Sequence, residues 1–360
     1  MDNKSTKLIV LTGGGTAGHV TPNLALVPTL KAQGYDVKYI GSKAGIERNL
    51  IESEGIPYYP ISSGKVRRYF DLKNFTDVFR VAAGIFQSIG LLRKLKPNVI
   101  FSKGGFVAVP VVIAAKVLKI PCVCHESDYT PGLANKISAK FAPKILTAFE
   151  STLKYLPKEK AVYVGSPVRK ELLDGDAKAG LDFLGFDGSK PVLLVLGGSQ
   201  GSQRLNKAVR DALPMLLNSF DVAHGCGKGN LDETLEGTKG YVQFEYINQE
   251  MPHVLKAANI AVSRSGANAI FEYLSVGLPS LLVPLEVGSR GDQVLNAEEF
   301  VSKGYSKMLR ETDIKSSDDL YNSVMDLYNN RPKYIEAMQN FAKNDTIEHI
   351  VSIINSCAKK

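Results

Sequence analysis

Residues 8–22 read LIVLTGGGTAGHVTP, and residues 191–206 read PVLLVLGGSQGSQRLN. In each stretch an apolar run typical of a buried parallel strand leads into a glycine-rich turn and then into a helical pattern. Such a turn directs backbone N–H groups and a helix N-terminus at one point, which favours binding of a phosphate. One copy would be weak evidence. Two copies predict two nucleotide-fold domains that face each other across a cleft.

Length and composition fit a soluble two-domain protein. The chain has 360 residues, of which 44% are hydrophobic and 22% are charged, enough for two full cores. No apolar run reaches the ~18 residues of a membrane-spanning helix, and the N-terminus lacks a signal-peptide pattern. The four cysteines are expected to be reduced thiols rather than metal ligands, so we expect a cytosolic location. They are Cys122, Cys124, Cys226 and Cys357.

Positive charge is concentrated in the first half of the chain. Residues 1–165 hold 23 Lys and Arg against 11 Asp and Glu, a net of +12, whereas residues 166–360 hold 21 against 25, a net of −4. This asymmetry favours an anionic partner for the first half, such as a nucleic acid, an anionic membrane surface or a phosphorylated substrate. No RRM, KH or aromatic stacking signature accompanies the charge, so we expect no nucleic acid partner.

Strands alternate with helices along the chain, which predicts an α/β fold with parallel sheets. A turn-rich stretch around residues 165–188 separates two series of strands. We expect an N-terminal domain over residues 1–165 and a C-terminal domain over residues 166–340, followed by helices at about 340–360. The expected strands cover residues 7–12, 37–40, 57–61, 99–102, 121–125, 145–147 and 162–164, then 192–196, 222–225, 242–245, 260–263, 280–283 and 306–308.

The first glycine turn matches the dinucleotide fingerprint Gly13-x-Gly15-x-x-Gly18, but the wider pattern does not. The second expected strand ends Tyr-Ile-Gly-Ser, without the carboxylate that binds a ribose in NAD enzymes. No Gly-Lys-Ser/Thr sequence occurs, which excludes a P-loop. His19 follows Gly18 at the helix N-terminus, where the dipole favours its neutral form. It is therefore a general base, a phosphate contact or a cap of the turn.

Further polar clusters follow apolar strands, where open α/β sheets bind ligands. His125 and Glu126 end the stretch PCVCHE. They are either ligand-binding residues or a buried pair with a structural role. Residues 263–268 (SRSGAN) and 288–293 (GSRGDQ) precede helices in the same way, and Glu272 lies where a carboxylate can accept ribose hydroxyls. No HExxH occurs, and residues 174–176 (DGD) are typical of a solvated turn, so we expect no metal site.

Residues 72–95 carry more apolar side chains than one core-facing helix stripe needs. One helical face holds Phe75, Phe79 and Phe86. Two interpretations stay open here: a wide buried face, or a patch that binds an anionic membrane surface. The basic residues beside or within this segment are Arg67, Arg68, Lys73 and Arg80.

Together these motifs resemble those of MurG-type N-acetylglucosaminyltransferases, a family of peripheral membrane enzymes of peptidoglycan synthesis. The resemblance implies a GT-B fold of two Rossmann-like domains, with C-terminal helices packed back on the first. It also implies inverting transfer of N-acetylglucosamine from UDP-N-acetylglucosamine to the 4-hydroxyl of the muramoyl sugar of lipid I, giving lipid II at the cytoplasmic face of the membrane. The matching stretches, in family order, are GGGTAGHVTP, SKGGFVAVP, HESDYTPGLANK, GSPVR, GGSQGSQRLN, SRSGANAIFE and RGDQVLNA.

The resemblance also assigns site residues by their places in the motifs. The expected donor contacts are Thr16, Ala17, Gly18 and Asp128 in the first domain, Arg169 at the hinge, and Ser199, Ile247, Ala267, Asn268, Ala269, Ile270, Phe271, Glu272 and Gln293 in the second. The expected contacts to the acceptor diphosphate are Gly14, Gly15, Gly104 and Gly105. Asp128 and Asp292 stand where some relatives have Asn and Gln.

In-line displacement at the anomeric carbon needs a base for the attacking hydroxyl and charge stabilisation for the departing UDP. His19 is the first candidate for the base and Glu126 the second. Backbone amides and a helix dipole can neutralise the diphosphate, so we expect no cofactor and no tightly held metal. One alternative is a UDP-N-acetylglucosamine 2-epimerase-like enzyme, which gives no reason for the +12 of the first half. Another is a basic nucleotide-binding module without catalysis.

Overall fold

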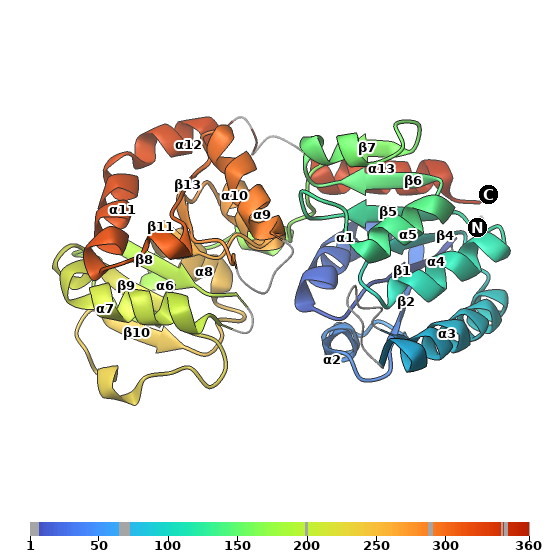
Figure 1. Ribbon diagram of the computed structural model, residues 1–360, viewed down its shortest axis with the longest axis horizontal. Helices are drawn as coiled ribbons and strands as arrows, with labels where there is room; N and C mark the ends of the chain where they lie inside the picture. The colour runs from blue at the N-terminus through green and yellow to red at the C-terminus, as the bar shows by residue number, and fades with distance from the viewer. Residues whose placement is uncertain are drawn as a thin grey trace. The chain divides into compact units, whose positions relative to one another are not determined.

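A computed structural model of the chain describes residues 7–64, 73–198, 201–286, 291–339, 341 and 345–359, without the side chains of residues 73–76. The chain divides into two compact units (Figure 1). The first consists of Met1–Arg169 together with Asp345–Lys360, and the second of Lys170–Asn344. Each unit has its own sheet and its own core.

The first unit contains a seven-stranded parallel sheet in the order β3-β2-β1-β4-β5-β6-β7. Its central strands are apolar and buried along almost their whole length, as parallel strands covered by helices on both faces must be. Its strands are β1 (Lys7–Thr12), β2 (Tyr35–Ser42), β3 (Tyr58–Ile61), β4 (Val99–Ser102), β5 (Cys122–Glu126), β6 (Lys144–Thr147) and β7 (Ala161–Tyr163). Its first helices are η1 (Ala17–His19), α1 (Thr21–Ala32), α2 (Ile46–Glu52), α3 (Lys73–Leu95), α4 (Ala108–Val117), α5 (Leu133–Phe141) and η2 (Glu150–Tyr155).

The last helix of the chain, α13 (Thr346–Cys357), belongs to the first unit and lies against α1 (Figure 1). Its apolar stripe, which includes Ile350 and Ile354, joins the core formed by α1, β1 and β4. Tyr35 Oη donates a hydrogen bond to Asn355 Oδ1 (2.8 Å), and Lys359 N donates to Asn98 O (2.9 Å). Apolar burial and these bonds fix the C-terminal segment on the first unit.

The second unit contains a six-stranded parallel sheet in the order β10-β9-β8-β11-β12-β13. Its strands are β8 (Val192–Leu196), β9 (Asp221–Gly225), β10 (Tyr241–Phe244), β11 (Ala258–Ser263), β12 (Ser280–Leu282) and β13 (Ser306–Met308). Its helices are η3 (Lys170–Leu173), α6 (Ala177–Leu184), α7 (Gln203–Ser219), η4 (Glu233–Leu235), α8 (Met251–Ala257), α9 (Ala267–Val276), α10 (Asp292–Ser302), η5 (Glu311–Asp313), α11 (Ser317–Asn329) and α12 (Arg331–Gln339).

Both sheets reverse their strand order at one point, and this positions the candidate sites. In the first sheet the reversal lies between β1 and β4, and in the second between β8 and β11. Ligands of open α/β sheets bind at the carboxyl ends of the strands beside such a switch point. The glycine turn after β1 and the glycine turn after β8 both lie there, which confirms the expected pair of Rossmann-like sheets.

The first unit extends to Arg169 rather than ending at the expected residue 165. Gly165 N donates to Thr147 O (3.2 Å), and Gly165 O is bonded to the His125 ring (2.9 Å). Val164 and Ser166 are also buried. These contacts hold the segment after β7 on the first sheet before the chain enters the second unit.

Candidate active site

Two glycine turns meet at the switch point of the first sheet, one after β1 and one after β4. A Cβ atom on Gly105 would lie 2.3 Å from the Gly14 carbonyl oxygen and 3.0 Å from the His19 ring. Gly105 also has a φ of +79°, a left-handed conformation that residues with a side chain adopt only at a cost. Glycine at this position therefore allows the two turns and the His19 ring to approach closely.

Glu47 stabilises the first turn through hydrogen bonds to its carboxylate. Its carboxylate is fully buried in α2 and accepts hydrogen bonds from Gly15 N (3.2 Å) and Ser42 N (3.0 Å). In the second turn, Gly104 N donates to Ser102 Oγ (3.3 Å). Of the four glycines predicted to bind the acceptor diphosphate, Gly15 and Gly104 thus already use their amides within the protein. Gly14 and Gly105 are the better placed pair.

His19 ends the short helix η1, between the first turn and α1. The residue is half-buried, and its carbonyl oxygen accepts a hydrogen bond from Asn23 Nδ2 (3.4 Å). Thr16 is exposed, and Ala17 and Gly18 are half-buried. The structure therefore places the first base candidate and three predicted donor contacts in one short segment at the carboxyl end of β1.

Glu126, the second base candidate, is bonded through both carboxylate oxygens. Oε1 accepts from Ser127 N (2.8 Å) and Asp128 N (3.0 Å). Oε2 accepts from Gly132 N (2.9 Å) and Asn135 Nδ2 (2.8 Å). Burial, and to a lesser degree Asp128, raises the pKa of Glu126. A carboxylate with four internal donors organises the loop that follows β5, so Glu126 stays the second base candidate after His19.

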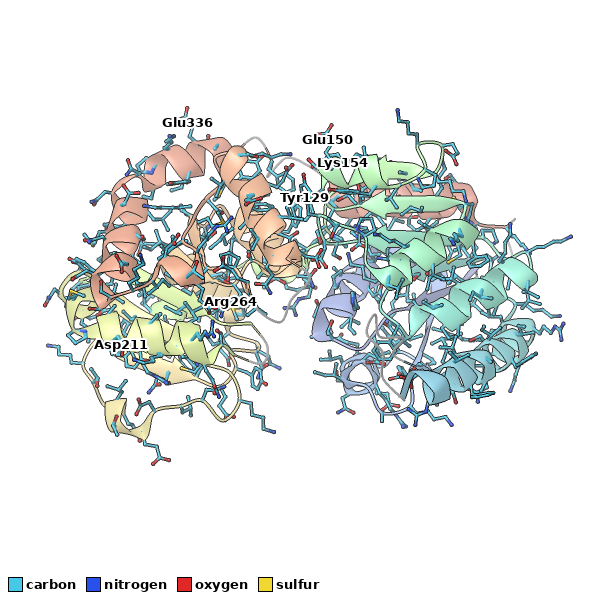
Figure 2. The ribbon with its side chains drawn as sticks, viewed as in Figure 1. Tyr129, Glu150, Lys154, Asp211, Arg264 and Glu336 are labelled. Atoms are coloured by element: carbon cyan, nitrogen blue, oxygen red, sulfur yellow. The ribbon has the colours of Figure 1, made fainter. Side chains whose placement is uncertain are left out.

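The loop after Glu126 is also braced from η2. Thr152 Oγ1 donates to Tyr129 O (2.9 Å), and Lys154 Nζ donates to Tyr129 Oη (2.9 Å) while lying 4.9 Å from the centre of the Tyr129 ring (Figure 2). Asp128, a predicted donor contact, is half-buried in this loop. Arg169, the predicted hinge contact, is exposed at the end of the first unit.

In the second unit, α9 begins at the carboxyl end of β11 with Gly266 as its N-cap and no side-chain cap. Ala267, Asn268 and Ala269 form its first turn, so their backbone can face an anion. Ile270 and Phe271 are 1% and 3% exposed, and the Phe271 ring packs 5.3 Å from the Phe300 ring. Their side chains belong to the core, so the predicted donor contacts of these two residues are left to their backbone.

The other predicted donor residues of the second unit lie around the same edge. Glu272 is half-buried on α9, and Ile247 is 9% exposed after β10. Gln293 Oε1 accepts a hydrogen bond from Leu285 N (3.0 Å), and Gln293 O accepts one from Ser265 Oγ (2.7 Å). The amide Nε2 of Gln293 is therefore the atom suited to a ligand. Ser199 lies outside the described residues.

Arg264 ties together the loops at the carboxyl edge of the second sheet (Figure 2). Its Nη1 donates to Val283 O (3.0 Å) and Pro284 O (3.2 Å). Its Nη2 donates to Ser202 Oγ (2.6 Å) and Glu311 Oε1 (2.5 Å). Ser202 caps α7 directly after the second glycine turn. One buried guanidinium therefore connects segments that follow β8, β11, β12 and β13.

Sequence reasoning missed Glu47, Lys103 and Arg264 as residues that shape the site. All three are charged, at most 7% exposed, and adjacent to a turn or strand end of the predicted sites. A charged residue directly beside an apolar strand, such as Lys103 after VIFS, was the available signal.

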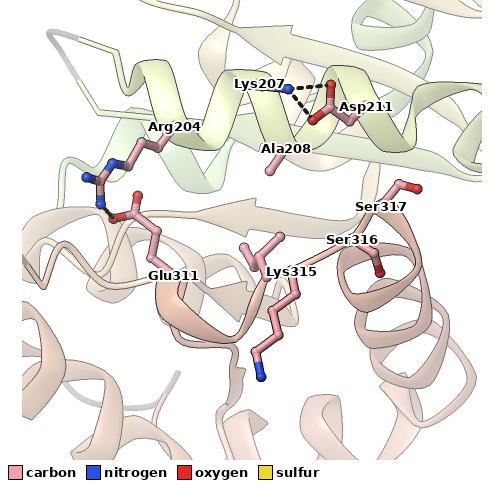
Figure 3. A pocket seen from close by; sticks show the side chains of 9 residues that line it. Arg204, Lys207, Ala208, Asp211, Glu311, Lys315, Ser316 and Ser317 are labelled. Carbon is pink, nitrogen blue, oxygen red and sulfur yellow. Dashed lines mark hydrogen bonds and ion pairs between the residues drawn. The ribbon is translucent and has the colours of Figure 1, made fainter.

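A groove of about 360 Å³ lies between α7 and η5 in the second unit (Figure 3). Four of its five charged side chains form two pairs, Arg204 with Glu311 (3.2 Å) and Lys207 with Asp211 (2.6 Å). No sequence-predicted site residue lines it. Among the described residues there is also no cluster of three or more metal-ligating side chains.

The predicted membrane patch falls on α3. Phe79 and Phe86 are 71% and 74% exposed and lie seven positions apart, on one helical face, with Val78 exposed beside them. Arg80 is exposed and pairs with Asp77 (3.4 Å). Leu92, by contrast, is buried in the core. Arg67 and Arg68 lie outside the described residues, as do the side chains of Lys73 and Phe75.

None of the helices within the described part of the chain is long and apolar enough to span a bilayer.

Comparison with known proteins matches both units to one family. Residues 9–147 match the glycosyltransferase family 28 N-terminal domain, and residues 192–352 match the family 28 C-terminal domain. Relatives from Lachnoclostridium phytofermentans and Lachnospira eligens are 54% and 55% identical over 98% of this chain and their whole length. Both bear the name UDP-N-acetylglucosamine–N-acetylmuramyl-(pentapeptide) pyrophosphoryl-undecaprenol N-acetylglucosamine transferase.

Solved structures agree in fold. The crystal structure of Acinetobacter baumannii MurG superposes with a TM-score of 0.76 at 24% identity, covering 97% of this chain and 99% of that one. The kitacinnamycin glycosyltransferase gives the same TM-score at 16% identity, covering 98% and 99%. With both domain matches and relatives of this identity over nearly its full length, the chain belongs to glycosyltransferase family 28.

Proposed function

We propose that this protein transfers N-acetylglucosamine from UDP-N-acetylglucosamine to the 4-hydroxyl of the muramoyl sugar of lipid I, and so forms lipid II. The observation that carries the proposal is identity above 50% over almost the whole chain to relatives named for this transferase activity. The two family 28 domains also fall one in each unit of the structure.

The proposed donor site is the carboxyl edge of the second sheet. The diphosphate of UDP lies at the uncapped N-terminus of α9, where the helix dipole favours an anion. The carboxylate of Glu272 accepts the ribose hydroxyls, and Ile247 packs against the uracil. Gln293 donates from Nε2 to the sugar, since its Oε1 is bonded to Leu285 N. Ile270 and Phe271 support this site from the core.

The proposed acceptor site is the meeting point of the two glycine turns of the first unit. Gly14 and Gly105 provide amides for the acceptor diphosphate, and the adjacent His19 is the general base. As the 4-hydroxyl oxygen attacks the anomeric carbon, a neutral His19 takes the hydroxyl proton. The bond between that carbon and the UDP oxygen breaks on the opposite face, and UDP leaves with the electron pair. The amides and dipole of α9 stabilise its negative charge.

The apolar face around Phe79 and Phe86 is the proposed membrane contact of the first unit. Exposed aromatic side chains next to basic residues suit an anionic lipid surface. Such a contact would bring the first unit to the surface that holds a lipid-linked acceptor.

The decisive experiment incubates the purified full-length protein with labelled UDP-N-acetylglucosamine, with and without a lipid I analogue. We expect UDP and a disaccharide-bearing lipid product only when the acceptor is present. Conversion of the donor to its 2-epimer without acceptor would instead identify an epimerase. UDP-N-acetylglucosamine binding without either reaction would leave a nucleotide-binding module.

A further inference from the structure

We propose that Lys103 is a positioning residue that holds His125 in one tautomer and thereby fixes Gly165, where the chain begins to leave the first sheet. Lys103 Nζ lies 2.6 Å from His125 Nδ1, and His125 Nε2 lies 2.9 Å from Gly165 O. Both side chains are fully buried. The three residues form a buried hydrogen-bond chain that links the start of the glycine turn after β4 to the segment after β7.

The chemistry of the three groups fixes which atom donates and which accepts in each of these hydrogen bonds. A backbone carbonyl can only accept, and a lysine Nζ has N–H groups to donate whether or not it carries a charge. His125 Nδ1 must therefore accept from Lys103, while Nε2 carries the hydrogen and donates to Gly165 O. The opposite tautomer would place a lone pair against the Gly165 carbonyl oxygen, which costs the energy of a buried unsatisfied group. Burial, together with the charge of Lys103, lowers the pKa of His125 well below its usual value, which keeps the ring neutral.

The two ends of this hydrogen-bond chain, Lys103 and Gly165, lie in segments that the proposed reaction uses. Lys103 follows β4 and directly precedes Gly104 and Gly105, whose φ values are +87° and +79°. Gly165, with φ +88°, precedes the short segment that ends the first unit at Arg169. A change of the His125 tautomer would release this segment, and with it the predicted hinge contact to the donor. The catalytic consequence rests on the proposed function, whereas the tautomer does not.

Nuclear magnetic resonance of the full-length protein labelled with 15N-histidine tests the tautomer. The chain has only five histidines, so the signals of His125 can be assigned by their loss in His125→Gln. We expect wild-type His125 to be neutral with hydrogen on Nε2 near pH 7.5. We expect Lys103→Met to give a mixture of tautomers, and the exposed control Lys116→Met to leave the wild-type pattern. Hydrogen on Nδ1 in the wild type, or an unchanged pattern in Lys103→Met, would overturn the proposal.

A double-mutant cycle tests the consequence for catalysis. Lys103→Met should lower kcat/KM for UDP-N-acetylglucosamine by roughly tenfold, within the range that displaced positioning groups cost. In a His125→Gln background the same substitution should add less than about twofold, because glutamine needs no lysine to fix its donor. Equal effects in both backgrounds would show that Lys103 does not act through His125. Thermal unfolding of every variant shows which losses of activity come from misfolding. The tautomer measured by nuclear magnetic resonance does not depend on whether the wild type has transferase activity.

Discussion

At the scale of single residues, the first unit places a histidine where two glycine turns touch. Glycine at residue 105 is needed because a Cβ would lie 2.3 Å from the Gly14 carbonyl oxygen. The half-buried His19 ring lies against this contact, at the carboxyl end of β1. Lys103, which begins the turn after β4, is bonded to His125 (2.6 Å), and Glu126 is bonded through both oxygens to the loop after β5. His19 is therefore the residue on which the base hypothesis depends.

Replacement of this base should separate turnover from donor binding. We expect His19→Ala to lower kcat by about 10²–10⁴-fold, the usual effect of removing a general base. The affinity for UDP should stay within about twofold, because the proposed UDP site lies in the second unit. Steady-state kinetics at saturating substrates and calorimetric titration with UDP measure the two quantities. A kcat within a few-fold of wild type would make His19 a structural residue of the turn.

Lys103 should make the stability of the first unit depend on pH. Burial lowers the pKa of Lys103 from 10.5 to about 7, although Glu126 and Asp128 act in the opposite direction. Between about pH 7 and pH 10.5, Lys103 keeps its proton in the unfolded chain but has lost it in the folded protein. The free energy of unfolding therefore rises with pH in this window, by up to about 1.4 kcal/mol per unit. This gain in the free energy of unfolding is lost as the pH falls through about 7.

Urea unfolding of Lys103→Met, Lys116→Met and the wild type, at about pH 7.5 and 9.5, measures this slope. The groups around Lys103 Nζ are His125, Glu126 and Asp128, and all three remain in the Lys103 variant. We expect the rise with pH in the wild type and in Lys116→Met, and a smaller rise in Lys103→Met. The same slope in all three proteins would show that Lys103 keeps an ordinary pKa.

At the scale of elements, loops that follow four different strands of the second sheet depend on one arginine. Arg264 donates to Ser202, Val283, Pro284 and Glu311, and Glu311 also accepts from Arg204. The planar guanidinium can reach all four partners because its donors point in fixed directions. The glycine turn after β8 and the loop that leads into α9 are thus linked through one side chain.

A lysine at this position keeps the charge but loses the planar fork of donors. We expect Arg264→Lys to weaken UDP binding by about tenfold, or about 1.4 kcal/mol. Arg331→Lys is the matched control, since that guanidinium stacks on Tyr328 in α11, 4.1 Å from the ring centre. Calorimetric titration with UDP distinguishes the two variants. Wild-type affinity for UDP in a folded Arg264→Lys protein would show that the hydrogen bonds of Arg264 do not shape the UDP site.

The strands were predictable because they are short apolar runs bounded by turn residues. All thirteen expected strands occur in the described residues, with ends shifted by at most two positions, as in β2 and β11. The glycine turns were predictable for the same local reason. The roles of Glu47 and Arg264 were not, since Glu47 bonds Gly15 across 32 positions and Arg264 bonds Ser202 across 62. The burial of the Ile270 and Phe271 side chains was not predictable either, because a motif match does not show which side chains of a helix face the core.

At the scale of the whole molecule, the two units differ in surface chemistry. Residues 1–165 carry a net charge of +12, and residues 166–360 carry −4. The exposed phenylalanines of α3 belong to the basic unit. In the proposed function one unit has to approach a lipid-linked diphosphate while the other takes a soluble nucleotide sugar. Charge and exposed apolar surface support the proposal that the first unit performs the first task.

Binding to lipid vesicles tests this assignment. Each phenylalanine that inserts fully contributes about 1.5–3 kcal/mol, and each basic residue near an anionic surface adds about 1 kcal/mol. The charge effect fades with salt over a Debye length of about 8 Å. We therefore expect co-sedimentation with anionic vesicles that falls but does not vanish at high salt. Phe79→Ser with Phe86→Ser should weaken it most at high salt, where the apolar contribution dominates.

The control for this loss is Leu231→Ser, which removes an exposed apolar side chain, 49% exposed, from the second unit. Because Phe79 and Phe86 are mostly in solvent, their replacement should leave the unfolding temperature within a few degrees of the wild type. Binding that is equal on neutral and anionic vesicles would refute the electrostatic contribution. Binding that the double phenylalanine variant retains in full would show that α3 is not the contact. The acceptor lipid would then have to reach the glycine turns by another surface of the first unit.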